Sequence, residues 1–267
     1  MSHLLSVYKG YFRTSLAVQF QYRAAMFIWL LGAIMEPLVY LVVWRTVALQ
    51  QGGSVGGYDV GGFAAYYLTM MLVNHFTFSW IMWEYDYRIR SGEFSSLLLK
   101  PVHPIHSDMA DNWAYKLFTL TLYVPVAIGL AWLFRPTWNV EGWALLVLPV
   151  ALILAFLTRF FLDWSLAMSA FWTTRVQAIN QAYFVAMLFF SGRLAPLTLF
   201  PPWFQRIADF LPFRWVMAFP VELALGRLTP GQALIGFGVQ LGWMAAGLLL
   251  LNLVYRAGIR RYAAFGG

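Results

Sequence analysis

The chain has 267 residues, of which 61% are hydrophobic, 19% are aromatic and 11% are charged, and its formal net charge is +7. A soluble globular domain contains about 25% charged residues, so this composition excludes an ordinary soluble protein and predicts a membrane protein. The absence of cysteine excludes disulfide bonds, thiolate metal sites and cysteine nucleophiles.

Residues 1–23 precede the first apolar run and carry apolar side chains at helical spacing. These side chains are Leu5, Tyr8, Phe12, Leu16 and Phe20. Lys9, Arg13 and Arg23 lie elsewhere around the same helix. The pattern predicts an amphipathic helix that lies in the membrane interface. A plain cytoplasmic extension of the first span is the alternative.

Six apolar segments are long enough to cross a bilayer, which requires about 20 residues each. They are residues 24–44, 63–83, 113–134, 143–170, 177–195 and 233–255. With the N-terminus inside, eleven basic residues lie on the cytoplasmic side and six lie outside. The positive-inside rule therefore predicts that both termini are cytoplasmic. The expected fold is all-α and polytopic, a single transmembrane domain over 1–267, and its positive charge requires no nucleic-acid partner.

Polar or ionisable residues within the predicted spans are costly in lipid, so they mark candidate functional positions. Glu36 precedes Pro37 in the first span, and it either lines a substrate path or hydrogen-bonds to a neighbouring helix. Arg159 and Asp163 lie four residues apart on one helical face, where they can neutralise each other. Asn74 in the second span is a weaker candidate of the same kind.

Residues 84–112 form a cytoplasmic loop that is longer than a connection requires. Phe94, Leu97 and Leu98 follow i, i+3, i+4 spacing, and Pro101 then ends the helix. This short amphipathic helix must cover its apolar face. It contacts either lipid headgroups or a groove on a cytoplasmic partner.

Residues 192–232 are rich in proline yet mostly apolar, and the predicted topology places them outside. Prolines at this density forbid one continuous spanning helix, while the apolar composition forbids a solvated loop. Short helices that form a re-entrant hairpin before the last span satisfy both conditions, and flat interfacial helices are the alternative. The first prolines of the segment are Pro196, Pro201, Pro202 and Pro212.

The last span contains Gly238 and Gly242 followed by Ala246, a stripe of small residues that permits close helix approach. The stripe could serve contact within the bundle or between subunits.

Motifs of nucleotide-binding and hydrolytic enzymes are absent from the sequence. It contains no G-x-x-x-x-G-K-[ST], no H-E-x-x-H and no G-x-S-x-G. His103 and His106 are three residues apart, but Pro104 prevents a helix that would put both on one face. We therefore expect neither an enzyme nor a metal site.

Two stretches, "RSGEFSSLLLKPVHP" at 90–104 and "FFSGRLAPLTLFPPWFQRIADFLPFRWVMAFPVELALG" at 189–226, carry a family resemblance. Together with the predicted order of elements, they resemble the permease subunit of a poorly characterised bacterial branch of ABC-2 type transporters. The resemblance implies pairing with a second permease, either the same chain or a sister chain. It also implies a separate cytoplasmic ABC ATPase, which would hold ATP and Mg, so this chain would bind no cofactor.

The resemblance further implies that residues 88–100 are the coupling helix, which seats in a cleft of the ATPase. The residues implied in coupling are Arg88, Arg90, Gly92, Glu93, Phe94, Leu97, Leu98 and Lys100. Family members mostly export lipids, glycans, drugs or peptides across the bacterial inner membrane, and the candidates for the translocation path are Glu36, Asn74, Arg159 and Asp163. A stand-alone secondary transporter or channel is the alternative, for which coupling-ion sites and inverted repeats would be expected.

Overall fold

The structure, a computed structural model, describes residues 2–173 and 175–262. Residues 1, 174 and 263–267 of the predicted domain lie outside these ranges. Within the described chain nearly every residue with regular structure is helical, which confirms the predicted all-α class. The exception is a small antiparallel hairpin of β1 (Ser54–Val55) and β2 (Tyr58–Asp59) between the first two long apolar helices.

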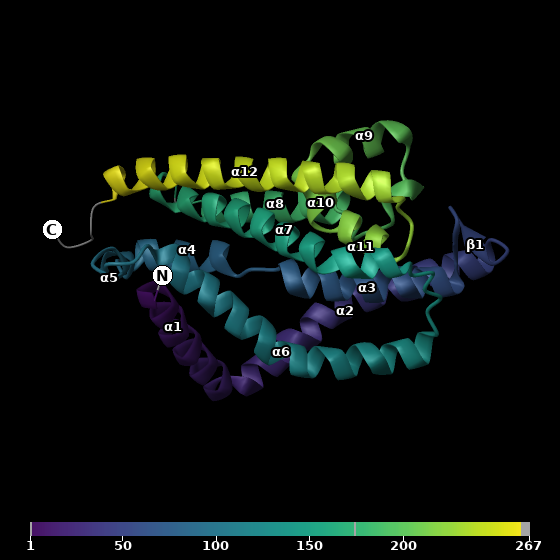
Figure 1. The fold of residues 1–267 in the computed structure, drawn as a ribbon, viewed down its shortest axis with the longest axis horizontal. Coiled ribbons are helices and arrows are strands. Elements are labelled where there is room, and N and C mark those ends of the chain that lie inside the picture. The colour runs from purple at the N-terminus through teal and green to yellow at the C-terminus, as the bar shows by residue number, and fades with distance from the viewer. Residues whose placement is uncertain (1, 174, 263–267) are drawn as a thin grey trace.

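The elements follow one another in an up-and-down arrangement (Figure 1). The longer helices are α1 (Ser2–Gln21), α2 (Arg23–Gln50), α3 (Val60–Thr77), α6 (Pro104–Phe134), α7 (Gly142–Ala167), α8 (Val176–Phe190) and α12 (Pro230–Arg261). The shorter ones are α4 (Ile81–Arg90), α5 (Phe94–Leu98), η1 (Met168–Phe171), η2 (Leu197–Leu199), α9 (Pro202–Phe210), α10 (Pro212–Val216) and α11 (Ala218–Ala224). The start of α1, α5 and the end of α12 lie at one end of the molecule, and the β hairpin lies at the other (Figure 1).

Four helical segments of the described chain are long and apolar enough to cross a membrane: α2, α6, α7 continued by η1, and α12. They correspond to four of the six predicted spans. The predicted span 63–83 is not one continuous helix, because α3 ends at Thr77 and α4 begins at Ile81. Helix α8 is apolar but has only 15 residues. The crossing of the membrane by these two segments stays a prediction.

The predicted N-terminal helix is present as α1, and it packs along the first part of α6. The Tyr8 hydroxyl is 2.8 Å from Nδ1 of His106, and the rings of Phe20 and Phe118 meet edge to face at 4.9 Å. Helix α2 starts directly after Tyr22, at an angle to α1 (Figure 1). The location of α1 in the membrane interface stays a prediction.

The segment 192–232 folds into short helices, as its prolines predict. Pro202 and Pro212 occupy the first turns of α9 and α10, while Pro196 and Pro201 directly precede η2 and α9. Proline suits these positions because its fixed φ fits a helix start and its missing N–H is not needed there. Every residue of α11 is buried, and the helix packs against α7. A dip of this segment into the membrane stays a prediction.

The most extensive helix packing joins α7 with α12 (Figure 1). Glycines make the close approach possible, because a Cβ atom at Gly258 would overlap the Phe171 ring at its Cδ2 atom, and one at Gly247 would lie 3.3 Å from Phe161 Cβ. The predicted stripe of Gly238, Gly242 and Ala246 is instead exposed. Added Cβ atoms at its two glycines would meet nothing within 4 Å in this chain.

Candidate substrate path and coupling segment

Three charged side chains, Lys116, Arg159 and Asp163, are buried beside the break between α3 and α4, and we call them the buried charge cluster. Their relative exposures are only 1%, 1% and 2%. Phe78 has an extended backbone, with φ −65° and ψ 145°, so the helical hydrogen-bond pattern stops there. Nζ of Lys116 donates to the freed Phe78 carbonyl at 2.6 Å. A cation thus satisfies the negative end of α3.

The two α7 members of the cluster bind mainly to the end of α3 and to the α3–α4 connection. Nη1 of Arg159 donates to Oδ1 of Asn74 and to Oγ1 of Thr77, both at 3.1 Å. Ser79 Oγ donates to Oδ2 of Asp163 at 2.6 Å. Arg159 Nε lies 3.8 Å from Asp163 Oδ2. The expected neutralisation along α7 is therefore present as a loose ion pair, supplemented by hydrogen bonds to another helix pair.

Glu36 lies in the middle of α2, which continues as a helix through Pro37. Its Oε2 accepts a hydrogen bond from Nη2 of Arg193 at 2.6 Å. Arg193 directly follows Gly192, whose φ of 84° turns the chain after α8. An added Cβ at Gly192 would also lie 2.5 Å from the Tyr66 hydroxyl oxygen, so glycine is required there by both conformation and space.

Glu36, Asn74 and Arg193 line one cavity of about 240 Å³, which we call the inner cavity. The other lining residues are Trp29, Gly32, Ala33, His75, Phe78, Trp80, Tyr115 and Tyr123. Because Asn74 also accepts a hydrogen bond from Arg159, the cavity wall connects to the buried charge cluster. The structure therefore brings all four candidate path residues into one neighbourhood, although their role in translocation stays a prediction.

Sequence reasoning missed Arg193 and Lys116. The positive-inside count placed Arg193 on the outer side and Lys116 on the cytoplasmic side, as ordinary basic residues. Both lie within predicted spans, 177–195 and 113–134, and a charge inside an apolar run was the available signal.

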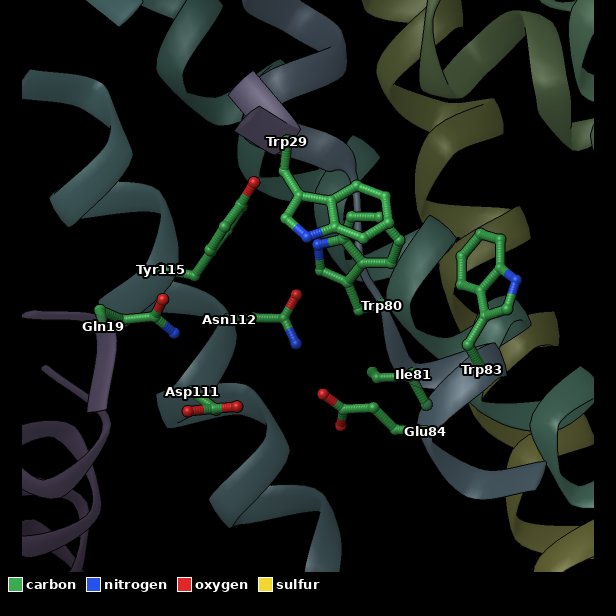
Figure 2. A pocket seen from close by; sticks show the side chains of 9 residues that line it. All are labelled: Gln19, Trp29, Trp80, Ile81, Trp83, Glu84, Asp111, Asn112 and Tyr115. Carbon is green, nitrogen blue, oxygen red and sulfur yellow. The ribbon is translucent and has the colours of Figure 1, made fainter. Parts of the chain in front are cut away.

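A second cavity, of about 260 Å³, is lined by nine side chains, and we call it the tryptophan cavity (Figure 2). They are Gln19, Trp29, Trp80, Ile81, Trp83, Glu84, Asp111, Asn112 and Tyr115. The Trp29 and Trp80 rings meet edge to face, with centroids 5.0 Å apart. These two residues and Tyr115 also line the inner cavity, so the two spaces share an aromatic wall.

The predicted coupling segment is anchored to the helix bundle through Asp108 of α6, which is 3% exposed. Its carboxylate accepts hydrogen bonds from the Tyr85 hydroxyl at 2.7 Å, from Arg88 Nη1 at 2.9 Å and from Trp164 Nε1 at 2.9 Å. Arg88 also pairs with Glu84 at 3.0 Å. Burial lowers the pKa of Arg88, but the Asp108 and Glu84 carboxylates more than offset this, and the pKa is raised overall. Arg88 therefore points to its own chain rather than to a partner.

Phe94 was predicted to lie on the apolar face that meets lipid headgroups or a partner, whereas the structure buries this side chain within its own chain. The helix itself is present as α5, after a turn at Gly92 with φ of 79°. The Phe94 ring, however, is 0% exposed and packs edge to face against Tyr85, Phe171 and Tyr262. Burial against three rings from distant parts of the chain outweighs solvation of the loop.

The exposed part of the segment differs from the predicted face. Leu97 and Leu98 are half-buried against the same aromatic cluster as Phe94. Leu99, which the helical spacing left out, is 88% exposed. The remaining exposed residues of the segment are Arg90, Ser91, Glu93, Ser96 and Lys100. A partner that contacts this segment therefore meets an apolar tip surrounded by charges.

Asp108→Ala is expected to lower the free energy of unfolding by about 3 kcal/mol, because three buried or half-buried donors lose their acceptor. Sodium dodecyl sulfate titration in mixed micelles would measure the change. Asp86→Ala is the matched control, since Asp86 forms only a partly exposed ion pair with Arg90 at 2.7 Å. That control should cost no more than about 1 kcal/mol. Equal effects of the two substitutions would contradict the anchoring role of Asp108.

Among the described residues no group of three or more His, Asp and Glu side chains is placed to hold a metal ion. His103 instead precedes α6, where its Nδ1 accepts from the Ile105 backbone N–H at 3.2 Å.

Most of the chain matches a known protein family. Residues 34–266 match the model of a family described as "ABC-2 family transporter protein". The match includes α2 beyond its first turns, the coupling segment and the segment 192–232. It also includes every residue that lines the two cavities except Gln19, Trp29, Gly32 and Ala33. A search of curated proteins finds no match.

Proposed function

Since this chain belongs to the ABC-2 family of transporters, multi-pass membrane proteins that act with ABC ATPases, we propose that it is the permease subunit of a bacterial ABC exporter. The family match over residues 34–266 is the observation that carries this proposal. The substrate is an amphipathic molecule, which includes the lipid-like, glycan and drug-like classes. A path with both aromatic walls and charged groups suits such a molecule.

The proposed path runs through the tryptophan cavity and the inner cavity. Glu36 and Asn74 contact the substrate directly in the inner cavity. Arg159 and Asp163 act behind the wall, where Arg159 holds Asn74 and the buried charge cluster holds the break between α3 and α4. Support comes from the hydrogen bond of Arg159 to Asn74 and from the aromatic residues that the two cavities share.

The proposed topology has six crossings, with α3 and the first residues of α4 (residues 63–83) together as the second and α8 as the fifth. Both termini are cytoplasmic, α1 lies in the inner-membrane interface and residues 192–232 form a re-entrant segment. The position of the start of α1, of α5 and of the end of α12 at one end of the molecule supports this arrangement (Figure 1). The complete burial of α11 favours a re-entrant segment over flat interfacial helices.

The proposed complex contains a separate ATPase that binds ATP and Mg, while this chain has no enzymatic activity of its own. The ATPase contacts the exposed part of the coupling segment, formed by Arg90, Glu93, Leu99 and Lys100. A second permease, either the same chain or a sister chain, completes the path. The exposed small-residue stripe on α12 offers a surface where a second helix could approach closely.

Reconstitution tests the proposal. The tagged chain would be co-expressed in turn with each P-loop ATPase subunit of its source genome. We expect one of them to co-purify in a fixed ratio and to drive ATP-dependent accumulation of an amphipathic dye in proteoliposomes. If no ATPase binds, and an ion gradient alone drives uptake, the chain is a secondary transporter or channel instead.

A further inference from the structure

The lining of the tryptophan cavity combines aromatic rings with an excess of negative charge. None of its nine lining residues is a lysine, an arginine or a histidine, whereas two are carboxylates, Glu84 and Asp111. Figure 2 shows the Glu84 and Asn112 side chains directed into the space beneath the Trp29 and Trp80 rings. The cavity is small compared with typical ligand sites of roughly 300–1,000 Å³, so it fits a headgroup or a small molecule rather than a whole lipid.

One carboxylate that lines the cavity has no charged partner among the described residues. Glu84 pairs with Arg88, and Arg88 also pairs with Asp108. Lys116 lies behind the cavity wall, where its Nζ donates to the Phe78 carbonyl and is 3.4 Å from Oδ1 of Asn112. Asp111 is half-buried and forms no ion pair or hydrogen bond with any other described residue. Both carboxylate oxygens of Asp111 are therefore available to bind a cation in the cavity.

Gln19 provides an independent indication of a ligand. The residue is only 7% exposed, and its buried Oε1 has no hydrogen-bond partner in the described chain. Its amide group points from α1 into the tryptophan cavity (Figure 2). A buried acceptor without a donor destabilises the protein unless something in the cavity satisfies it. A positively charged group there would interact favourably with both Gln19 Oε1 and Asp111.

The tryptophan rings supply the remaining part of a cation site. Trp29 and Trp80 meet at an interplanar angle of 70°, and the Trp83 ring lies beside Trp80, with their centroids 5.2 Å apart (Figure 2). Rings arranged around a common space bind alkylated ammonium groups, because each ring face attracts positive charge while excluding water. No described lysine or arginine has its charged group over any of these three rings.

We propose that the tryptophan cavity binds an organic cation, held by Asp111, Gln19 and the tryptophan rings, as the charged part of the transported substrate. This proposal rests on the proposed function. The shared wall of Trp29, Trp80 and Tyr115 leads from this site to the inner cavity, where Glu36 provides the next carboxylate.

Binding of radiolabelled benzyltrimethylammonium to the full chain tests the proposal. The chain would be purified in dodecyl maltoside, which carries no ammonium group, and binding would be measured by scintillation proximity. We expect saturable binding that excess neopentylbenzene, the uncharged analogue of the same shape, and benzylphosphonate do not displace. No saturable binding, or equal displacement by neopentylbenzene, would overturn the proposal.

Variants locate the site. Asp111→Asn should weaken binding about tenfold, since the shape is kept and the charge is lost. Trp80→Leu should weaken it by a similar factor, because a desolvated cation–π contact is lost. Glu141→Gln is the matched control, because Glu141 is an exposed carboxylate away from the cavity, and it should bind as the unmodified chain does. Unchanged binding by Asp111→Asn would contradict the site even if Trp80→Leu fails to fold.

Two further measurements complete the test. The first distinguishes a lipid headgroup from a free cation, and the second distinguishes a failure of this proposal from a failure of the proposed function. Displacement by dihexanoyl phosphatidylcholine at lower concentration than unlabelled benzyltrimethylammonium would identify a lipid headgroup, and its absence would identify a free cation; both outcomes support a cation site. The assay contains neither ATP nor ATPase. Cation binding without ATP-driven transport therefore overturns the proposed function alone. ATP-driven transport without preference for the cation overturns this proposal alone.

Discussion

Asp163→Asn is expected to lower the free energy of unfolding by about 3–5 kcal/mol, because it leaves Lys116 and Arg159 buried without a carboxylate. The amide can still accept the hydrogen bond from Ser79, so the measured loss of stability reflects the missing negative charge rather than a missing hydrogen bond. Transport should fall at least tenfold, since Arg159 also holds Asn74 in the wall of the inner cavity. Sodium dodecyl sulfate titration and proteoliposome uptake would measure the two effects.

A double variant provides the internal control. The cluster has two cations and one carboxylate, and Lys116→Met combined with Asp163→Asn restores its original net charge. Part of the lost stability should therefore return, which is the coupling expected of contacting groups. Asp209→Asn, at a half-exposed carboxylate that pairs with Arg214, should cost no more than about 1 kcal/mol. Additive losses in the double variant would show that Asp163 acts independently of Lys116.

The long helices were predictable because apolar runs of sufficient length have few other solutions in a membrane protein. Helix α12 and the proline-initiated helices α9 and α10 follow from local sequence alone. The break between α3 and α4 does not, because residues 78–80 contain neither proline nor glycine. It is held by Lys116 on the Phe78 carbonyl and by Asp163 on Ser79, and both contacts come from distant helices.

Charged residues of the candidate site were predictable from the sequence because a charge within an apolar span is unfavourable in lipid. The partner of an amphipathic helix face was not predictable in this way. The cost of charge in lipid identified Glu36, Arg159 and Asp163. The same periodicity that revealed an amphipathic α5 could not tell whether its apolar face meets a partner or its own chain. The Phe94 ring packs against Phe171 and Tyr262, whose proximity to it depends on the packing of α12 beside η1.

Leu99→Asp is expected to reduce co-purification of the ATPase more than tenfold while leaving thermal stability unchanged. Leu99 is 88% exposed, so a charge there costs the isolated chain little. In an apolar groove of a partner the same carboxylate would be desolvated without a counter-ion, which is strongly unfavourable. Quantitative pull-down and the ATP hydrolysis rate of the complex would measure the effect, and Leu99→Met, which keeps an apolar side chain of similar size, is the matched control.

Phe94→Asp tests a buried position of α5, in contrast to the exposed Leu99, which directly follows this helix. It should lower the free energy of unfolding by about 3–5 kcal/mol, because it removes a fully buried ring and introduces a buried charge. Any loss of ATPase binding in this variant should therefore accompany a lower unfolding transition, whereas Leu99→Asp should lose binding alone. If Leu99→Asp retains the ATPase and full activity, the partner does not contact the exposed tip of α5. The coupling surface must then be sought on the other side chains at this end of the molecule.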